Sequence, residues 1–227
     1  MPMVIIKAGW VVKRSYVMLS FIGAASLFGT PSSLAETYPP DVQAKLEACL
    51  HVRDASQIAS AISACTELLN QASWDADNRA RIYMSRGNAF DGSGNATKAI
   101  ADYDQAIALS PHVALFYYNR GFCYLRLKDE VRAKADFEQA VAVDPNFSYG
   151  HYYLGFLALH RKDFNDAIAH FDRAIALNPK MALAYLYRGT AYGKLGNGDK
   201  AVADLKDAIK IDPSLAKSIQ VDGKLMN

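Results

Sequence analysis

Histidine and cysteine are the residues of this sequence most able to bind a metal or to act as nucleophiles. No two of the five histidines have the i, i+4 spacing that places two metal ligands on one face of a helix. They are His51, His112, His151, His160 and His170. The stretch from Asp91 begins like a calcium-binding loop, but Ala96 stands where that loop requires a glycine. No serine or cysteine lies beside a base in a recognised pattern, so the sequence predicts no enzyme, no metal site and no cofactor.

Four glycines recur at one constant interval along the chain, and this regular period indicates a repeat protein. They are Gly87, Gly121, Gly155 and Gly189. Two alanines, a large apolar residue between them and a proline follow each glycine at fixed offsets; in the first repeat these are Ala99, Tyr103, Ala106 and Pro111. Small residues let helices approach closely, and a proline ends a helix. Each repeat is therefore predicted to contain two closely packed helices.

The remaining repeated positions define one face of the first helix and the turn that follows it. Aromatic residues at i−4 and i+3 relative to most of the glycines form an apolar stripe with them, which is typical of a buried helix face. A polar residue in the turn after each first helix could cap the second helix. These four residues are Asn95, Asp129, Asp163 and Asn197.

This pattern resembles the tetratricopeptide repeat (TPR) family, whose signature is an aromatic, a leucine-glycine pair and a tyrosine, then alanine, phenylalanine, alanine and proline. Arginine replaces the leucine in three repeats, at Arg86, Arg120 and Arg188, and Leu205 replaces the last phenylalanine. The resemblance implies an all-α fold, a right-handed superhelical stack of antiparallel helix pairs, or TPR solenoid. The four repeats would comprise residues 80–113, 114–147, 148–181 and 182–215.

Residues 1–35 have the composition of a secretory signal peptide. Lys7, Lys13 and Arg14 precede the apolar stretch 16–30, and small residues near Ala35 suit cleavage before Glu36. The apolar stretch is shorter than the roughly 20 residues of a membrane-spanning helix, so an uncleaved anchor is the weaker alternative. Cleavage removes three basic and no acidic residues from a chain with 25 basic and 23 acidic ones. The sequence thus predicts a near-neutral periplasmic or secreted protein that does not bind nucleic acid and meets the membrane only through its signal peptide.

Residues 36–79 are predicted to form a linker and a degenerate N-terminal helix pair. Cys49 and Cys65 have the same spacing as the glycine and the large apolar residue of a repeat, so they would face each other across this pair. The interval from Cys49 to Gly87 exceeds the repeat interval by about one helical turn, which indicates an insertion. Free cysteine is common in protein cores, but proximity and an oxidising compartment favour a disulfide. Cys123 is then an unpaired and unreactive core thiol.

A second stripe on each first helix, beside the packed one, is predicted to line a concave groove. In the two middle repeats it is aromatic and aliphatic, which suits either packing between helices or an apolar site for a partner peptide or helix. The candidate groove residues are Arg81, Met84, Asn88, Leu115, Tyr118, Phe122, Tyr149, Tyr152, Phe156 and Leu186. Charged residues on the second helices, among them Asp102, Asp104 and Asp136, are predicted to form a solvated outer face.

The sequence therefore predicts an exported protein-interaction module, an adaptor or assembly factor that binds a protein or peptide of unknown identity. The C-terminal tail, residues 216–227, is short and is therefore predicted to leave part of the apolar surface of the last helix pair exposed. This leaves an alternative, a self-assembling structural protein whose apolar faces form homo-oligomer contacts.

Overall fold

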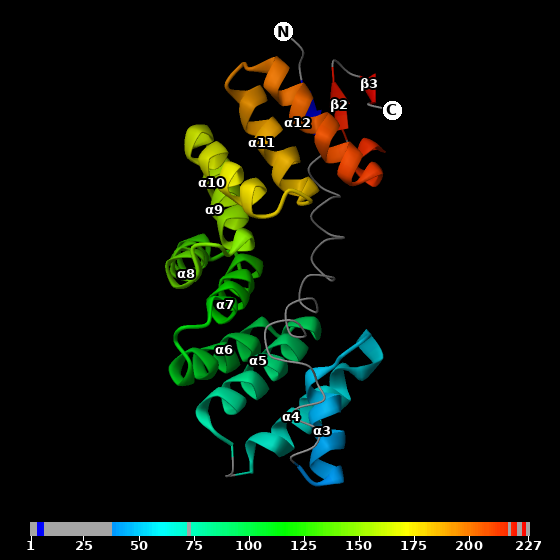
Figure 1. Cartoon of the computed structure of the whole chain (residues 1–227), viewed down its shortest axis with the longest axis vertical. Coiled ribbons are helices and arrows are strands. Elements are labelled where there is room, and N and C mark those ends of the chain that lie inside the picture. Colours follow the sequence, from blue (N-terminus) through cyan, green and yellow to red (C-terminus); the bar gives the residue numbers. More distant parts are fainter. Residues whose placement is uncertain (1–3, 7–37, 72–73, 218, 222–223, 226–227) are drawn as a thin grey trace. The chain divides into compact units, whose positions relative to one another are not determined.

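The computed structural model describes residues 4–6, 38–71, 74–217, 219–221 and 224–225. The chain divides into two compact units (Figure 1), residues 16–136 and residues 137–227 together with 1–15. Apart from residues 4–6, the predicted signal peptide lies outside the described residues. Helices make up most of the described part of both units, which confirms the predicted all-α class.

Helix pairs recur in both units. The unit of residues 16–136 contains α3 (Pro40–Leu50), the 3-10 helix η2 (Ala55–Gln57), α4 (Ile58–Leu69), α5 (Ala76–Gly92), α6 (Ala96–Leu109), α7 (Ala114–Arg126) and the start of α8 (Glu130–Val143). The other unit contains the end of α8, α9 (Ser148–His160), α10 (Phe164–Leu177), α11 (Ala182–Lys194), α12 (Gly198–Ile211) and the 3-10 helix η3 (Pro213–Lys217). Helices pack within pairs, such as α5 on α6, and between pairs, such as α4 on α5 and α10 on α11.

A small sheet that the sequence analysis did not predict lies in the unit of residues 137–227 and 1–15. Its strands are β1 (Val4–Ile6), β2 (Ile219–Val221) and β3 (Lys224–Leu225), in the order β1-β2-β3. Both pairings are antiparallel. The sheet therefore joins residues near the two ends of the chain.

Polar residues cap the second helix in three of the four repeats. The side chains of Asn95, Asp129 and Asn197 each accept a hydrogen bond from the backbone N–H at i+3, at 3.0 to 3.3 Å. Asp163 precedes α10 without such a bond. The predicted caps are thus present except in the third repeat.

The repeated glycines allow the large residue of the second helix to lie directly against the first helix. A Cβ atom on Gly155 would lie 2.9 Å from Cε1 of Phe171, and one on Gly87 would lie 2.8 Å from Cε1 of Tyr103. Both rings are buried, at 0% and 2% exposure, so neither can move aside freely. The regular recurrence of glycine is therefore a requirement for close contact between the helices of each pair.

We expect Gly155→Ala to lower the free energy of unfolding by about 1 to 3 kcal/mol, because the new methyl group overlaps the Phe171 ring. Urea unfolding followed by circular dichroism would measure the change. The double variant Gly155→Ala/Phe171→Leu should recover part of this loss, since the smaller leucine also occurs at this position in the last repeat. A Gly155→Ala protein as stable as the wild type would contradict the close contact.

The end of the last helix pair has more cover than the sequence suggested. Leu215 of η3 is only 5% exposed and packs with Leu186, Leu205 and Ala208. Residues at the end of the last repeat therefore shield part of its apolar surface, as a capping element does in repeat proteins.

Candidate functional site

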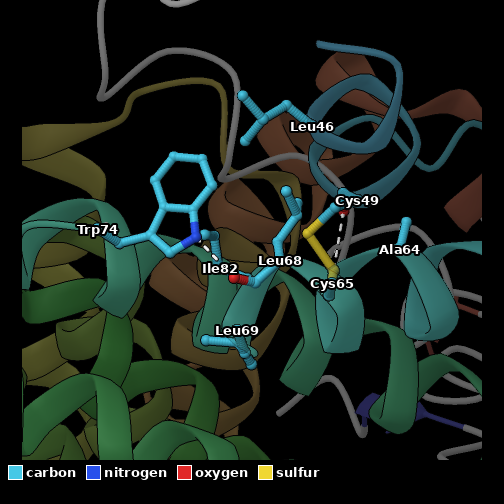
Figure 2. Close-up of a cluster of buried hydrophobic side chains, with 8 residues drawn as sticks. All are labelled: Leu46, Cys49, Ala64, Cys65, Leu68, Leu69, Trp74 and Ile82. Carbon is cyan, nitrogen blue, oxygen red and sulfur yellow. Dashed lines mark hydrogen bonds between the residues drawn. A yellow bond between two sulfur atoms is a disulfide. The ribbon is translucent and has the colours of Figure 1, made fainter. Parts of the chain in front are cut away.

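The two cysteines of the N-terminal helix pair form a disulfide, as the sequence predicted. Cys49 on α3 and Cys65 on α4 have Cα atoms 4.9 Å apart, and both residues are buried. They belong to an apolar cluster (Figure 2) that includes Leu46, Leu68 and Trp74. Closing a loop of this length stabilises a fold by about 3 kcal/mol. The disulfide thus links the two helices of the terminal pair.

The N-terminal pair is continuous with the first repeat. The indole Nε1 of Trp74 donates a hydrogen bond to the carbonyl oxygen of Leu68 at 2.6 Å. Arg79 on α5 donates through Nη2 to the carbonyl oxygen of Leu69 at 2.9 Å. Ile82 of α5 also lies in the apolar cluster that contains the disulfide. The N-terminal helix pair therefore packs against the first repeat as one more helix pair of the same series.

Three arginines on first helices form ion pairs with buried aspartates on second helices. Arg120 donates to Asp136 through Nε at 2.9 Å and Nη2 at 2.6 Å, and to Asp104 through Nη1 at 2.6 Å. Arg188 repeats this geometry with Asp204 and Asp172. We call each group of one arginine and its two partners an arginine clamp. Each clamp connects two successive second helices.

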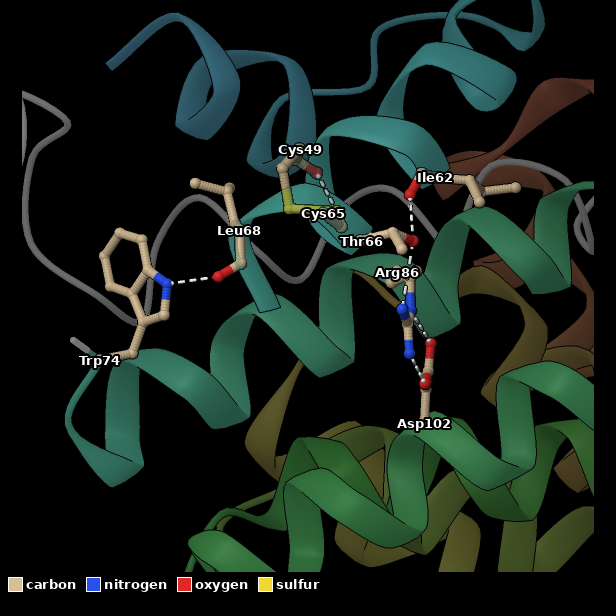
Figure 3. Close-up of a disulfide and its surroundings, with 8 residues drawn as sticks. All are labelled: Cys49, Ile62, Cys65, Thr66, Leu68, Trp74, Arg86 and Asp102. Carbon is tan, nitrogen blue, oxygen red and sulfur yellow. Dashed lines mark hydrogen bonds and ion pairs between the residues drawn. A yellow bond between two sulfur atoms is a disulfide. The ribbon is translucent and has the colours of Figure 1, made fainter. Parts of the chain in front are cut away.

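The first clamp confirms the register of the N-terminal pair. Arg86 binds Asp102 with two hydrogen bonds of 2.7 and 2.8 Å and donates through Nη1 to the hydroxyl of Thr66 at 3.1 Å (Figure 3). In the other clamps the outer partner is separated from the arginine by 16 positions, whereas Thr66 is separated from Arg86 by 20. The difference corresponds to about one helical turn, the predicted insertion. Thr66 therefore replaces the outer aspartate, and α3–α4 is a shifted repeat.

The clamps correct the prediction of a fully solvated outer face. Asp102 and Asp136 are each only 5% exposed, and Asp204 is equally buried. A carboxylate in such surroundings is stable only with a well-placed partner, and the bidentate arginine supplies one. The outer partner Asp104 is about half exposed, as predicted for that face. The signal in the sequence was the arginine before the glycine together with an aspartate at one constant spacing after it.

The candidate groove residues of the unit of residues 16–136 are mostly buried. Leu115, Tyr118 and Phe122 on α7 are each 6% or 7% exposed, and the rings of the last two are 6.5 Å apart. Met84 is 1% exposed, and Arg81 is partly buried. These side chains therefore take part in packing.

Asn88 has a structural role that the sequence analysis did not assign to it. Its side-chain oxygen accepts hydrogen bonds from the Tyr103 hydroxyl at 2.7 Å and from the Asn119 side chain at 3.1 Å. Because these three residues lie on α5, α6 and α7, Asn88 holds one helix pair to the first helix of the next.

The candidate residues of the other unit form an aromatic cluster with their neighbours. Tyr152 and Phe156 on α9 lie 6.1 and 5.5 Å from the Tyr187 ring of α11. Tyr149, at the start of α9, is partly exposed, and its ring lies 6.3 Å from Phe147. Leu186 is fully buried in the core of the last pair. These contacts show packing between first helices at Tyr152 and Phe156.

Comparison with protein families decides what kind of repeat this is. Models described as tetratricopeptide repeat match residues 114–147, 131–174 and 157–216, and one described as TPR repeat matches residues 80–128. Together the matched residues extend from 80 to 216, more than half of the chain. The chain belongs to the tetratricopeptide repeat family. This family comprises protein-interaction modules, and the resemblance seen in the sequence is confirmed.

Solved structures of other TPR proteins have the same fold. MamA is 22% identical, with a TM-score of 0.64 over 79% of this chain and 99% of MamA. A chain of the APC/C Cut9–Hcn1 hetero-tetramer is 20% identical, with a TM-score of 0.67 over 83% of this chain and 36% of its own length. YrrB, a TPR protein described as having an unusual peptide-binding site, is 20% identical, with a TM-score of 0.56 over 70% of this chain and 79% of its own. A sequence search of curated proteins finds no match.

The third repeat of this TPR protein has no arginine clamp. Leu154 stands at the arginine position and His170 at the position of the buried aspartate. His170 lies near Asp166, with 3.7 Å between Nε2 and Oδ1, and its ring is 5.8 Å from the ring of His151. His151 Nε2 lies 3.3 Å from the carbonyl oxygen of Pro145, and its Nδ1 is buried without a hydrogen-bond partner. A proton on Nδ1 would therefore find no acceptor.

Burial lowers the pKa of His151. The hydrogen bond to the Pro145 carbonyl raises this pKa, and the positive charge of Arg173 lowers it further. Below the ordinary histidine pKa of about 6.5, the unfolded chain therefore binds a proton that the folded chain does not. We therefore expect the free energy of unfolding to fall as the pH drops from above to below this value. The variant His151→Tyr should show a smaller fall, because tyrosine has no such proton to bind and is accommodated at this position in the other three repeats. Thermal melts on both sides of the histidine pKa test this. The matched control is His112→Tyr, at an exposed position, and this variant should retain the wild-type pH dependence.

Cys123 is a free and fully buried thiol, as predicted. Its Sγ donates to Oδ1 of Asp91 at 3.3 Å, and Arg126 binds the same carboxylate. Burial raises the pKa of the Cys123 thiol well above its usual range, and the adjacent Asp91 adds to this effect. A thiol without thiolate character is a poor nucleophile, so this side chain is suited to packing.

The described residues contain no cluster of three or more histidine, cysteine, aspartate or glutamate side chains able to hold a metal ion. Within the same part of the chain, no helix has the length and apolar character needed to cross a membrane.

Proposed function

We propose that this TPR protein is an exported adaptor or assembly factor that binds a peptide or protein segment along its first helices. The observation that supports this most directly is that a first helix in each unit, α7 in one and α9 in the other, carries several aromatic side chains. They are Tyr118, Phe122, Tyr149, Tyr152 and Phe156. Tyr118, Phe122, Tyr152 and Phe156 are 6% to 9% exposed, so a partner would contact the part of each ring that packing leaves accessible. Aromatic residues dominate the binding energy of protein interfaces when a partner covers them. Arg81 would extend this surface. Leu115 and Asn88 also hold neighbouring helices together, and Met84 and Leu186 act through packing alone.

A capture experiment tests the assignment. The full-length chain would be immobilised, its partners captured from an extract, and each partner purified and titrated by calorimetry. We expect Tyr118→Ala/Phe122→Ala/Tyr152→Ala/Phe156→Ala to weaken binding at least tenfold. Circular dichroism must show that this variant is folded. The single variant Tyr149→Ala, at a partly exposed position, should weaken binding less.

The matched control is Val131→Ala/Leu195→Ala, which removes apolar side chains that are 82% and 47% exposed. This variant should bind like the wild type. Partners that bind a folded quadruple variant with unchanged affinity would refute the proposed surface.

Export is the second part of the proposal. The buried disulfide supports it, because disulfides persist mainly in oxidising compartments. In a bacterial host, we expect the periplasmic or secreted protein to begin at Glu36, with the mass of residues 36–227. Amino-terminal sequencing and intact mass spectrometry measure this. A protein that keeps residues 1–35, or that stays in the cytoplasm, would disprove cleavage.

Self-assembly is the alternative function. Leu127, at the end of α7, and Val131, on α8, are 50% and 82% exposed, so both could contact a second copy of the chain. Light scattering of the full-length chain at tens of micromolar separates the two proposals, because an adaptor without its partner should remain a monomer.

A further inference from the structure

The N-terminal helix pair is attached to the repeats through α4 and the turn after it. Arg79 and Arg86 on α5 donate hydrogen bonds to Leu69 and Thr66, and Trp74 donates to Leu68. Ile82 packs in the same apolar cluster. None of these hydrogen bonds involves a residue of α3, and Figure 3 shows two of them, from Arg86 to Thr66 and from Trp74 to Leu68.

Apart from the disulfide, helix α3 is held mainly by apolar packing, to which the partly buried Val42, Ala48 and Leu50 contribute. Lys45 and Glu67 form its one ion pair with α4 among the described residues, at 3.1 Å, and both side chains are about one-third exposed or more. Exposed pairs contribute little to stability. Leu46 and Cys49 are its two buried side chains, and Pro39 provides no side-chain cap. An isolated helix of 11 residues is marginal in water, so α3 depends on this packing and on the disulfide.

The disulfide also holds α3 over apolar side chains of α4 and of the turn that follows it. Cys49 and Cys65 are 1% and 0% exposed and sit beside Leu68 (Figure 2). Tyr38, which precedes α3, packs against the Trp74 ring at 5.1 Å. Release of α3 would therefore expose Leu68 and Trp74 to water at the N-terminal end of the stack.

We propose that α3 is a thiol-controlled latch that closes over α4 when Cys49 and Cys65 are oxidised and opens when they are reduced. Closing transfers two electrons and two protons from the two thiols to a disulfide oxidant, such as glutathione disulfide, which becomes two thiols. Opening is the reverse exchange with a dithiol such as dithiothreitol, which becomes a cyclic disulfide. Because both cysteines are at most 1% exposed, the dithiol reaches the sulfur atoms when α3 separates transiently from α4, and reduction then prevents the disulfide from holding α3 closed. The thiol state of the compartment thus sets whether the N-terminal end of the stack is covered.

Hydrogen exchange of the oxidised and reduced full-length chain tests the latch. On reduction, amides of residues 40–50 should exchange roughly a hundredfold faster, because the constraint of a loop of this length is lost. Amides of α5 and α6 should be unchanged. In the variant Trp10→Phe, Trp74 is the remaining tryptophan, and its emission should shift to longer wavelength on reduction.

The cysteines provide matched controls. Cys49→Ser/Cys65→Ser should show the fast exchange with or without reductant, whereas Cys123→Ala should respond to reductant like the wild type. The latch is refuted if α3 is equally protected in both thiol states. It is also refuted if α3 to α7 lose protection together, because the disulfide then stabilises the whole unit. The exchange assay requires neither a partner nor export of the protein. A result that refutes the latch would therefore not contradict the proposed function.

Discussion

Replacing Arg188 with leucine is expected to lower the free energy of unfolding by about 3 kcal/mol, because it removes one partner of a buried ion pair. Asp204 is 5% exposed and accepts two hydrogen bonds from this guanidinium, at 2.9 and 2.7 Å. Without Arg188 the carboxylate must stay buried and uncompensated or bind a proton. Urea unfolding of the full-length chain would measure the loss.

The third repeat suggests how to rescue this variant. It combines Leu154 with His170 at the two clamp positions, so the same fold accommodates that pair. We expect Arg188→Leu/Asp204→His to unfold within about 1 kcal/mol of the wild type, since no buried charge is then left unpaired. Asp172→Ala is the control and should cost less than about 1 kcal/mol, because that outer partner is half exposed. A double variant as unstable as Arg188→Leu would show that the clamp acts through specific contacts of arginine instead.

The clamps illustrate what sequence reasoning could and could not predict. The repeat bounds follow from glycine, alanine and proline, because each marks a local requirement of helix contact or helix end. The arginine and the buried aspartate of a clamp lie on different helices, and they meet only after the pair has packed. Asp102 and Asp104 have the same charge and lie on the same helix, yet one is buried and the other exposed. Asp102 lies three residues after Ala99 and four before Ala106, so it shares their packed face, and Asp104 does not. The spacing thus contained the difference, but a charged residue on a packed face could be assigned only with its arginine partner on the other helix.

The disulfide was predictable and the partner surface was not, for a related reason. Cys49 and Cys65 could be placed because they occupy positions whose contact is fixed in every repeat. Tyr152 and Phe156 pack against Tyr187, yet large aromatic rings of this kind are also those that bind partners. One residue type suits both roles, so the sequence left both open.

The strands β2 and β3 were missed for a different reason. They contain 3 and 2 residues, which is too short for the alternating pattern that indicates a strand. The pairing of β2 with β1 also joins residues near the two ends of the sequence, and no local signal reports such a contact.

Phe171→Ala is expected to have the largest effect of any single change in the unit of residues 137–227, about 3 to 5 kcal/mol. The ring is fully buried, lies against Gly155 of α9, and stacks 6.2 Å from Tyr187 of α11. A single side chain of α10 thus joins the two first helices of this unit. Its removal leaves a cavity that the surrounding helices cannot close, because the backbone at Gly155 has no side chain to fill it. Urea unfolding measures the loss.

The same ring lies 6.1 Å from Tyr152, so its loss also tests whether packing positions the proposed partner surface. We expect Phe171→Leu to cost about 1.5 kcal/mol or less, because leucine fills this position in the last repeat, and to retain partner binding. Phe171→Ala, studied below its melting temperature, should bind the partner at least tenfold more weakly although Phe171 itself is inaccessible to a ligand. If binding is unchanged while stability falls, Tyr152 is held by other contacts. The surface and the core of this unit would then be independent, and partner binding would depend on the accessible part of α9 alone.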